Sequence, residues 1–236
     1  MDMSIADLQC MRVWGRLSSH GRYYRQHLFS WHKAYFFTGQ PSVLAGGRET
    51  SGLGIRLVDK DSADLQEMVV KALAALKCPK RLSAAETVES IVRMNELMCI
   101  VLDGETVVAQ QWFSPGMSYM PWLKACLRLS DDEIYEHGIF VKESHRRRGL
   151  LTLMRSFVYE RIKERGFARV VNAVMSWNVA TLRSNSRFGF QRMGAVVYGY
   201  IAGCRYCFAA MPEGRLSCMS GTVLNVPHSL KGVVYE

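Results

Sequence analysis

The sequence predicts a mixed α/β fold, because helical stripes and short apolar strands alternate through residues 54–212. The 236 residues are 49% hydrophobic and 22% charged and include only 6 prolines, a composition that suits one large domain with a sizeable core. Residues 1–53 are interpreted as an N-terminal extension and residues 213–236 as a C-terminal tail. We expect a chain that starts near Gly54 to keep the chemistry of the domain.

Each element is predicted from a local pattern. Ser83 and Glu86 have the spacing of a capping box at a helix start. Asp103-Gly104 separates two strand-like runs, and both residue types tolerate the positive φ of a hairpin. The strands are predicted at residues 55–58, 98–102, 106–113, 134–141, 169–175, 195–201 and 206–211, and the helices at residues 65–76, 83–94, 150–166 and 179–188.

The formal net charge of +9 predicts an anionic partner. Coenzyme A (CoA), nucleic acid, an acidic carrier protein and an anionic membrane all qualify on charge alone. No apolar run is long enough to cross a bilayer, and the N-terminus lacks the pattern of a signal peptide. The 7 cysteines are odd in number, and Cys204-x-x-Cys207 has no second pair, which argues against zinc. We therefore expect a cytoplasmic protein with no metal site and no transmembrane segment.

The richest chemistry lies where a predicted strand enters a helix through a basic loop. Unpaired N–H groups and the helix dipole attract anions at a helix N-terminus. Gly149 lets the backbone approach a phosphate closely. Taken alone, the segment also fits a solvated basic turn. Its candidate ligand-binding residues are Ile139, Phe140, Val141, Arg146, Arg147, Arg148, Gly149, Leu150 and Leu151.

A second motif follows one helix and one strand later, from Asn178-x-x-Thr181 to Gly189-Phe190. Together the two motifs resemble the GNAT (GCN5-related) N-acetyltransferase superfamily. That family has a Q/R-x-x-G-x-G/A loop for the CoA pyrophosphate and an N-x-x-A/S…G-F segment beside the pantetheine arm. The resemblance covers residues 54–212 and implies a GNAT fold. In that fold a central mixed, mostly antiparallel sheet is flanked by helices.

The resemblance implies an acyl-CoA site, with acetyl-CoA or another acyl-CoA as cosubstrate. Backbone at residues 139–141 is expected along the pantetheine, and N–H groups of residues 146–151 around the pyrophosphate. Arg146-x-x-Gly149-x-Leu151 matches the family loop except at Leu151, where Gly or Ala is usual. The larger side chain of Leu151 is expected to shift the phosphate loop.

The second motif supplies the rest of the expected cofactor site. Asn178 is expected to reach the pantetheine, with Ser184 assisting. Asn185 stands where many family members have a tyrosine that protonates the departing thiolate. An amide does not act as an acid, so a water or the product amine would have to serve instead.

The catalytic base is expected on the strand that precedes the loop. Tyr135 and His137 share one face of that strand and Glu136 lies on the other, unless a bulge changes the parity. His137 stands where some amine acetyltransferases of the family carry a histidine, and an ordinary imidazole suits base work near neutral pH. The alternative is that His137 is structural. Glu133 or Glu136 would then be the base, or positioning of the reactants alone would suffice.

Two segments leave their roles open. Residues 20–40 mix basic and aromatic side chains, which suits a nucleic acid, a membrane surface or, the favoured interpretation, a helix docked on the domain. Residues 114–130 contain Pro115, Gly116 and Pro121 and interrupt the pattern of elements. They form either part of an acceptor pocket or an ordinary packed insertion.

Three functions fit the sequence. The first is transfer of an acetyl group from acetyl-CoA to the primary amine of a small molecule, such as an amino sugar or an amino acid derivative. The second is N-acylation with longer chains from acyl-CoA or from acyl carrier protein, an acidic donor that the positive charge suits. The third is a non-catalytic acyl-CoA-binding module. No nucleic acid partner is expected, and a homodimer is left open.

Overall fold

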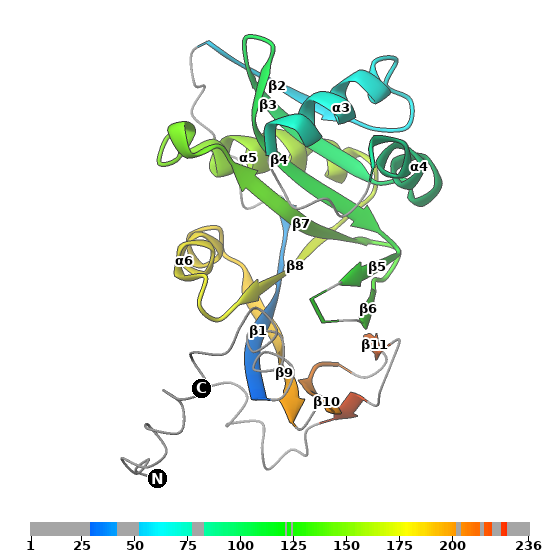
Figure 1. Ribbon diagram of the computed structural model, residues 1–236, viewed down its shortest axis with the longest axis vertical. Coiled ribbons are helices and arrows are strands. Elements are labelled where there is room, and N and C mark those ends of the chain that lie inside the picture. Colours follow the sequence, from blue (N-terminus) through cyan, green and yellow to red (C-terminus); the bar gives the residue numbers. More distant parts are fainter. Residues whose placement is uncertain are drawn as a thin grey trace, which may run out of the picture.

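The computed structural model of the chain describes residues 29–41, 52–76, 83–120, 122–123, 125–201, 204–212, 215–218 and 223–225 (Figure 1). No helix in these ranges is long and apolar enough to cross a membrane. The strands are β1 (Phe29–Gly39), β2 (Leu53–Val58), β3 (Leu97–Asp103), β4 (Thr106–Pro115), β5 (Met117–Met120), β6 (Ala125–Arg128), β7 (Glu133–Val141), β8 (Arg169–Met175), β9 (Gln191–Ile201), β10 (Cys204–Ala210), β11 (Leu216–Cys218) and β12 (Val223–Asn225). The helices are α3 (Leu65–Leu76), α4 (Ala84–Met94), the 3-10 turn η2 (Glu143–His145), α5 (Leu150–Glu164) and α6 (Val179–Arg187).

A nine-stranded sheet forms the centre of the fold, in the order β12-β10-β9-β1-β8-β7-β4-β3-β2. Its neighbours are antiparallel except for β7 with β8 and β10 with β12. A second sheet contains β11, β6 and β5. The predicted mixed α/β class, with a mostly antiparallel sheet and flanking helices, is therefore confirmed.

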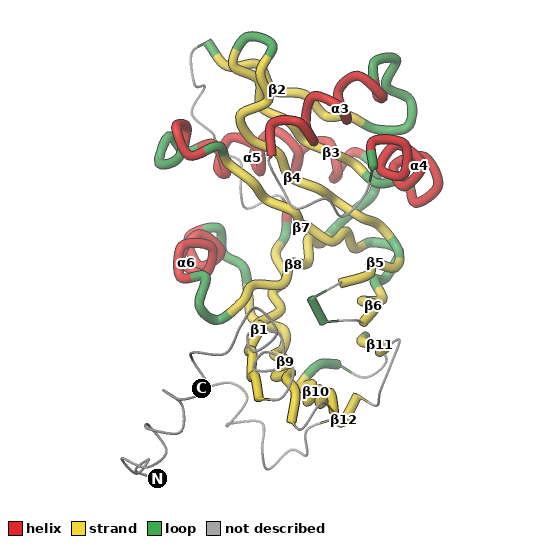
Figure 2. The backbone as a smooth tube through the Cα atoms, in the orientation of Figure 1, coloured by secondary structure: helices red, strands yellow, loops and turns green. Residues whose placement is uncertain are grey.

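The helices lie on both faces of the sheet, as Figures 1 and 2 show. Alternate residues of β4 point to opposite faces. Trp112 therefore packs with Ile91 of α4 in one core, and Phe113 packs with Tyr159 of α5 in the other. The α3–α4 core also contains Ile100 of β3. The sheet is thus covered by α3 and α4 on one side and by α5 on the other.

Several local predictions are confirmed. Ser83 and Glu86 form both hydrogen bonds of the capping box, and α4 begins directly after Ser83. Gly104 has a φ of 57° in the hairpin between β3 and β4, and Gly166 has a φ of 91° just beyond the end of α5. At these positions residue type and local geometry agree.

The expected helix within residues 20–40 is wrong where the structure describes it. Phe29–Gly39 forms β1, which pairs with β8 on one side and with β9 on the other. Ala34 and Phe36 are fully buried, and Tyr35 lies in a separate cluster on the opposite face. A strand covered on both faces is apolar throughout, which explains why its aromatic run resembled one face of a helix. Residues 20–28 lie outside the described residues.

The C-terminal segment also contributes to the two sheets. β11 pairs with β6, and β12 pairs with β10. Arg215 donates to both carboxylate oxygens of Glu133, the first residue of β7. Residues 226–236 lie outside the described part of the chain. The domain limits at residues 53 and 212 stay a prediction, and strands from both flanking segments join the sheets.

Candidate acyl-CoA site

The central feature of the site is the separation of two parallel strands. β7 and β8 pair only from Glu133–Glu136 with Arg169–Asn172, although both strands continue further. Beyond this point β7 remains paired with β4, and no strand in the described ranges pairs with its other edge. The backbone of residues 138–141 therefore lies along an edge that no described strand pairs with, at the position where the sequence predicts the pantetheine. At Val141 this edge is partly occupied, because the Val141 carbonyl accepts from Arg146 Nε at 3.3 Å.

A bulge at Gly138 redirects this free edge. The β4–β7 register shifts between Gln110 and Trp112, and Gly138 has a φ of 59°. A Cβ atom built on Gly138 would lie 2.7 Å from Cδ1 of Trp112. Both the positive φ and the close indole ring therefore favour glycine here. Bulges commonly bend a strand next to functional sites.

The loop after β7 has the geometry of an anion site. His145, in the turn η2, bonds through Nε2 to Asp103 at 3.1 Å and anchors the loop to the β3–β4 hairpin. Arg147 and Gly149 both have positive φ, at 63° and 77°. Left-handed residues turn successive N–H groups toward one point, an arrangement that binds anions. The side chains of Arg146, Arg147 and Arg148 are all exposed.

The first turn of α5 leaves its N–H groups free. Gly149 provides no side-chain cap, and no acidic residue lies in this turn. The first backbone bond into the helix is from Leu153 N to the Gly149 carbonyl at 3.0 Å. Within the described residues no acceptor bonds to the N–H groups of residues 147–152. The expectation that the N–H of Arg146 belongs to this set is wrong, because it bonds to the Glu143 carbonyl at 3.2 Å. Leu150 is buried and Leu151 is half-buried in the α5 core, so side-chain packing fixes the helix start.

The second motif begins α6 at the end of β8. Oδ1 of Asn178 accepts from the N–H of Thr181 at 3.2 Å, so this half-buried side chain caps the helix. Ser184 is half-buried and accepts from Arg155 Nη1 at 3.4 Å. Asn178 therefore lies at the N-terminus of α6, just beyond the end of β8. Its contact with pantetheine stays a prediction.

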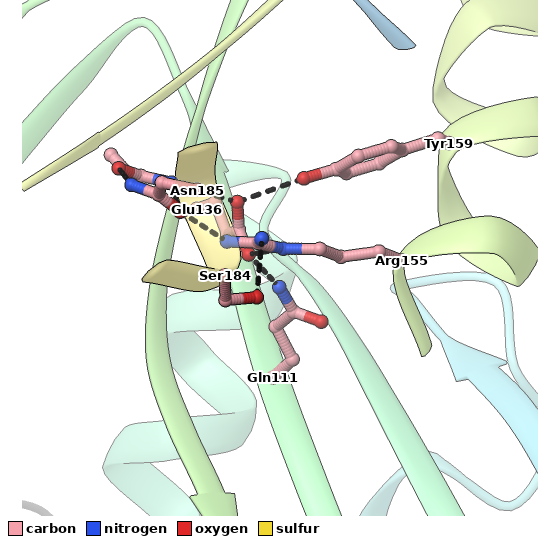
Figure 3. A network of polar contacts seen from close by, with 7 residues as sticks. Gln111, Glu136, Arg155, Tyr159, Ser184 and Asn185 are labelled. Carbon is pink, nitrogen blue, oxygen red and sulfur yellow. Dashed lines mark hydrogen bonds and ion pairs between the residues drawn. The ribbon is translucent and has the colours of Figure 1, made fainter. Parts of the chain in front are cut away.

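A network of buried polar contacts surrounds Glu136, the last residue of β7 that pairs with β8 (Figure 3). The Glu136 carboxylate is completely buried and accepts from Arg155 Nε at 2.7 Å, from the Tyr159 hydroxyl at 2.9 Å and from Asn172 Nδ2 at 3.2 Å. The amide of Gln111 is a fourth donor. Burial and the nearby carboxylate raise the pKa of the Tyr159 hydroxyl, which therefore stays protonated as a donor.

Arg155 connects this carboxylate to α6. Its guanidinium donates from Nη2 to Oδ1 of Asn185 at 3.0 Å and lies about 5 Å from the rings of Phe188 and Phe190. Burial alone would lower the pKa of Arg155, but the charge of Glu136, the nearby Tyr159 and the hydrogen bond to Glu136 together outweigh it and raise that pKa. The network therefore joins β7, α5 and α6 through one buried ion pair.

The structure places Asn185 inside this network. The side chain is 0% exposed, and its amide also exchanges hydrogen bonds with Asn172 at 2.8 and 3.3 Å. Direct contact with a bound cofactor would require these bonds to break. The expectation that a water or the product amine replaces the family's tyrosine remains a prediction.

Sequence analysis missed Arg155, Asn172 and Gln111 as members of the site. Two signals in the sequence mark the first two of these residues. Arg155 lies on the buried stripe of α5, one turn from Leu151 and Tyr159, and Asn172 interrupts an otherwise apolar buried strand. A polar residue at a core position needs a buried partner.

His137 lies on the opposite face of β7 from Glu136. Its ring stacks on that of Tyr135 with centroids 5.3 Å apart, so these two residues share a face, as the strand period predicts. His137 Nε2 lies 2.7 Å from Oγ of Ser114 on β4. Burial lowers the pKa of His137, and the charges of Glu96 and Glu136 oppose this shift only partly. Burial raises the pKa of Tyr135, so its hydroxyl keeps its proton near neutral pH and is unsuited to act as the base.

No curated protein matches the sequence. Among solved structures, a functionally unknown conserved protein from Staphylococcus epidermidis is 14% identical, with 84% of this chain and 67% of that chain covered and a TM-score of 0.49. AAC(6')-Iy in complex with a CoA bisubstrate analogue is 16% identical, with 60% and 92% covered and a TM-score of 0.46. Aminoglycoside 6'-N-acetyltransferase AAC(6')-Ih from Acinetobacter baumannii is 17% identical, with 59% and 91% covered and a TM-score of 0.43.

The sequence model of the acetyltransferase (GNAT) family matches residues 69–190, just over half of the chain. The match includes the separating strands, the basic loop, the start of α5 and the whole of α6. It ends at Phe190, the last residue of the second motif. The chain therefore belongs to the GNAT acetyltransferase family, whose members are acyltransferases that use acetyl-CoA.

Proposed function

We propose that the protein is an N-acetyltransferase that transfers the acetyl group of acetyl-CoA to the primary amine of a small molecule. One observation carries this proposal. The unpaired edge of β7 leads directly into an uncapped helix N-terminus surrounded by three exposed arginines. A strand edge suits the amide groups of pantetheine, and the loop suits a pyrophosphate.

The residues have distinct roles in this proposal. The backbone of Ile139, Phe140 and Val141 binds the pantetheine, and N–H groups from Arg147 to Thr152 bind the pyrophosphate. Asn178 lies on the far side of the pantetheine, at the start of α6. Together these groups orient the thioester so that its carbonyl carbon meets the acceptor amine, and such positioning supplies much of the rate.

His137 is the proposed base. It accepts a proton from the acceptor ammonium, which leaves a neutral amine able to attack the thioester carbonyl. Glu136 is unsuited to this step because four donors already surround its buried carboxylate. The lowered pKa of His137 keeps the imidazole neutral, and therefore competent, near neutral pH.

The binding half of the proposal is tested by Gly149→Glu. This change places a carboxylate and a bulky side chain where the pyrophosphate binds, so calorimetry should show loss of acetyl-CoA affinity. Gly104→Glu is the matched control, because both glycines have positive φ with no atom near a built Cβ and so carry the same backbone strain. If a folded Gly149→Glu binds as tightly as Gly104→Glu, the site is misplaced.

The donor is tested by comparing acetyl-CoA, a long-chain acyl-CoA and acyl carrier protein with a panel of amines. Leu151 and the +9 charge keep the longer donors as the second candidate, because they fit an altered phosphate loop and an acidic partner. Turnover with acetyl-CoA alone would support the main proposal. Tight acetyl-CoA binding without turnover of any amine would favour a non-catalytic binding module.

A further inference from the structure

We infer that Glu96 and Ser114 position His137 with its proton on Nε2, which makes Nδ1 the atom that accepts the proton of the acceptor ammonium. The inference rests on the proposed function, because it concerns the residue proposed there as the base. It adds two positioning residues that neither touch the cofactor site nor belong to either sequence motif.

Three neighbouring strands bring these side chains together. Leu97 of β3 is paired with Phe113 of β4, so Glu96 and Ser114 follow as the next opposed pair. Ser114 is in turn paired with Tyr135 of β7, one step along the same face from His137. The three groups therefore form a row across the sheet, on the face covered by α3 and α4.

The distances define a continuous chain of hydrogen bonds. The Ser114 hydroxyl donates to Oε1 of Glu96 at 2.5 Å, and His137 Nε2 lies 2.7 Å from the same hydroxyl oxygen. The other carboxylate oxygen of Glu96 accepts from the Ser90 hydroxyl on α4 at 2.8 Å. Glu96 is therefore held by a serine at each oxygen.

Counting protons fixes the tautomer of His137. An ionised carboxylate only accepts hydrogen bonds, so Ser114 must use its single proton on Glu96. The oxygen of Ser114 can then only accept from His137, and this requires a proton on Nε2. Within the described residues no group bonds to Nδ1. The lone pair on Nδ1 is therefore the one left for the substrate.

The same arrangement supports the charged product of the proton transfer. The ammonium loses one proton to Nδ1, which yields a neutral amine and an imidazolium. Glu96 is half-buried, and its negative charge favours that imidazolium through Ser114. Glu136 is the other charged group that acts on the ring, and its own charge is paired with Arg155 behind the strand.

Ser114 does not suit the role of nucleophile that a serine beside a histidine suggests. Ser114 is only 2% exposed, and its hydroxyl proton is directed to Glu96 rather than to His137. A serine nucleophile needs the opposite polarity, with the hydroxyl donating to the imidazole. The direction of these bonds therefore favours a positioning role.

The test combines nitrogen NMR of histidine-labelled protein with kinetics. We expect the wild type to show one His137 tautomer, protonated at Nε2, with the signal assigned by its loss in His137→Gln. Ser114→Ala should give a mixture of tautomers and lower kcat roughly tenfold, as loss of an orienting partner typically does, with the KM for acetyl-CoA unchanged. Ser114→Thr keeps the hydroxyl and should restore the single tautomer.

Thr87→Val is the matched control, because it removes a buried hydroxyl of α4 that bonds to the Ser83 carbonyl and not to Glu96, Ser114 or His137. Glu96→Gln keeps an acceptor for Ser114 but removes the charge, so the acid limb of kcat/KM should move to lower pH. A single Nε2 tautomer and unchanged kcat in folded Ser114→Ala would overturn the inference. Full activity of His137→Gln would instead refute the proposed role of His137 as the base. The NMR result would still show separately whether Ser114 sets the tautomer of His137.

Discussion

Arg155→Met should remove a large part of the stability of the fold. Arg155 and Glu136 both have side chains that are 0% exposed, and they form an ion pair of 2.7 Å. Methionine fills much of the volume of the arginine stem but leaves the carboxylate without a counter-charge. Removing one partner of a buried pair costs about 3–5 kcal/mol, against a typical total of roughly 5–15 kcal/mol.

Part of this cost comes from the charge and part from lost hydrogen bonds. Glu136 would keep its three neutral donors, while Asn185 and Ser184 would lose the guanidinium. In the double variant Arg155→Met/Glu136→Gln the charge is gone and an acceptor oxygen remains. We therefore expect the double variant to be more stable than the sum of the two single changes predicts, by about 0.5–3 kcal/mol.

Urea unfolding followed by circular dichroism measures these differences, provided the slope with urea stays constant. Arg93→Met is the control, because Arg93 also pairs with a glutamate, Glu89, one turn earlier on α4. This pair is exposed, with side-chain exposures of 76% for Arg93 and 54% for Glu89. Such a pair is worth about 0.3–0.5 kcal/mol. A loss for Arg155→Met no larger than that of the control would refute the buried-charge argument.

Two further predictions concern titrating groups. His137→Gln should lower kcat about 10²-fold and abolish the acid limb of kcat/KM. In the wild type this limb should lie below the ordinary histidine pKa of about 6.5, because burial lowers the pKa of His137. If His137→Gln is as active as the wild type from pH 6 to 8, roughly the range a histidine base governs, His137 is structural. Burial raises the pKa of Glu133, but Arg215, the Ser130 N–H and Arg169 outweigh it and lower that pKa. The unfolded chain then binds more protons, so stability should fall as the pH falls below about 4.3. Arg215→Met should weaken this fall in thermal melts from pH 3 to 6, and an unchanged profile would contradict the assignment.

The sequence was most informative where short-range chemistry decides the structure. Ser83 and Glu86 satisfy each other within one helical turn, and Asn178 caps α6 three residues from its partner. Residue type and spacing are sufficient for such features. The basic loop is a similar case, because the positive φ of 77° at Gly149, directly before α5, is a conformation that glycine adopts without help from distant residues.

Long-range pairing is what the sequence did not reveal. The neighbours of β1 are β8 and β9, and nothing within residues 29–39 specifies partners so far along the chain. Because β1 lies inside the sheet, we expect a chain that starts near Gly54 to lose the fold. This replaces the expectation, drawn from reading residues 1–53 as an extension, that such a chain keeps its chemistry. The orientation of Asn185 depends likewise on Arg155, a partner on a different helix.

The position of β1 also has a consequence for synthesis on the ribosome. Ala34 pairs with both Met175 and Val196, so the first described strand to emerge waits for nearly the last ones before either edge is satisfied. During that interval an aromatic strand with two open edges is exposed to self-association. The large sheet closes only after β9 is made, and such non-local pairing is slow. We therefore expect β1 to need protection in the nascent chain until its C-terminal partners have been made.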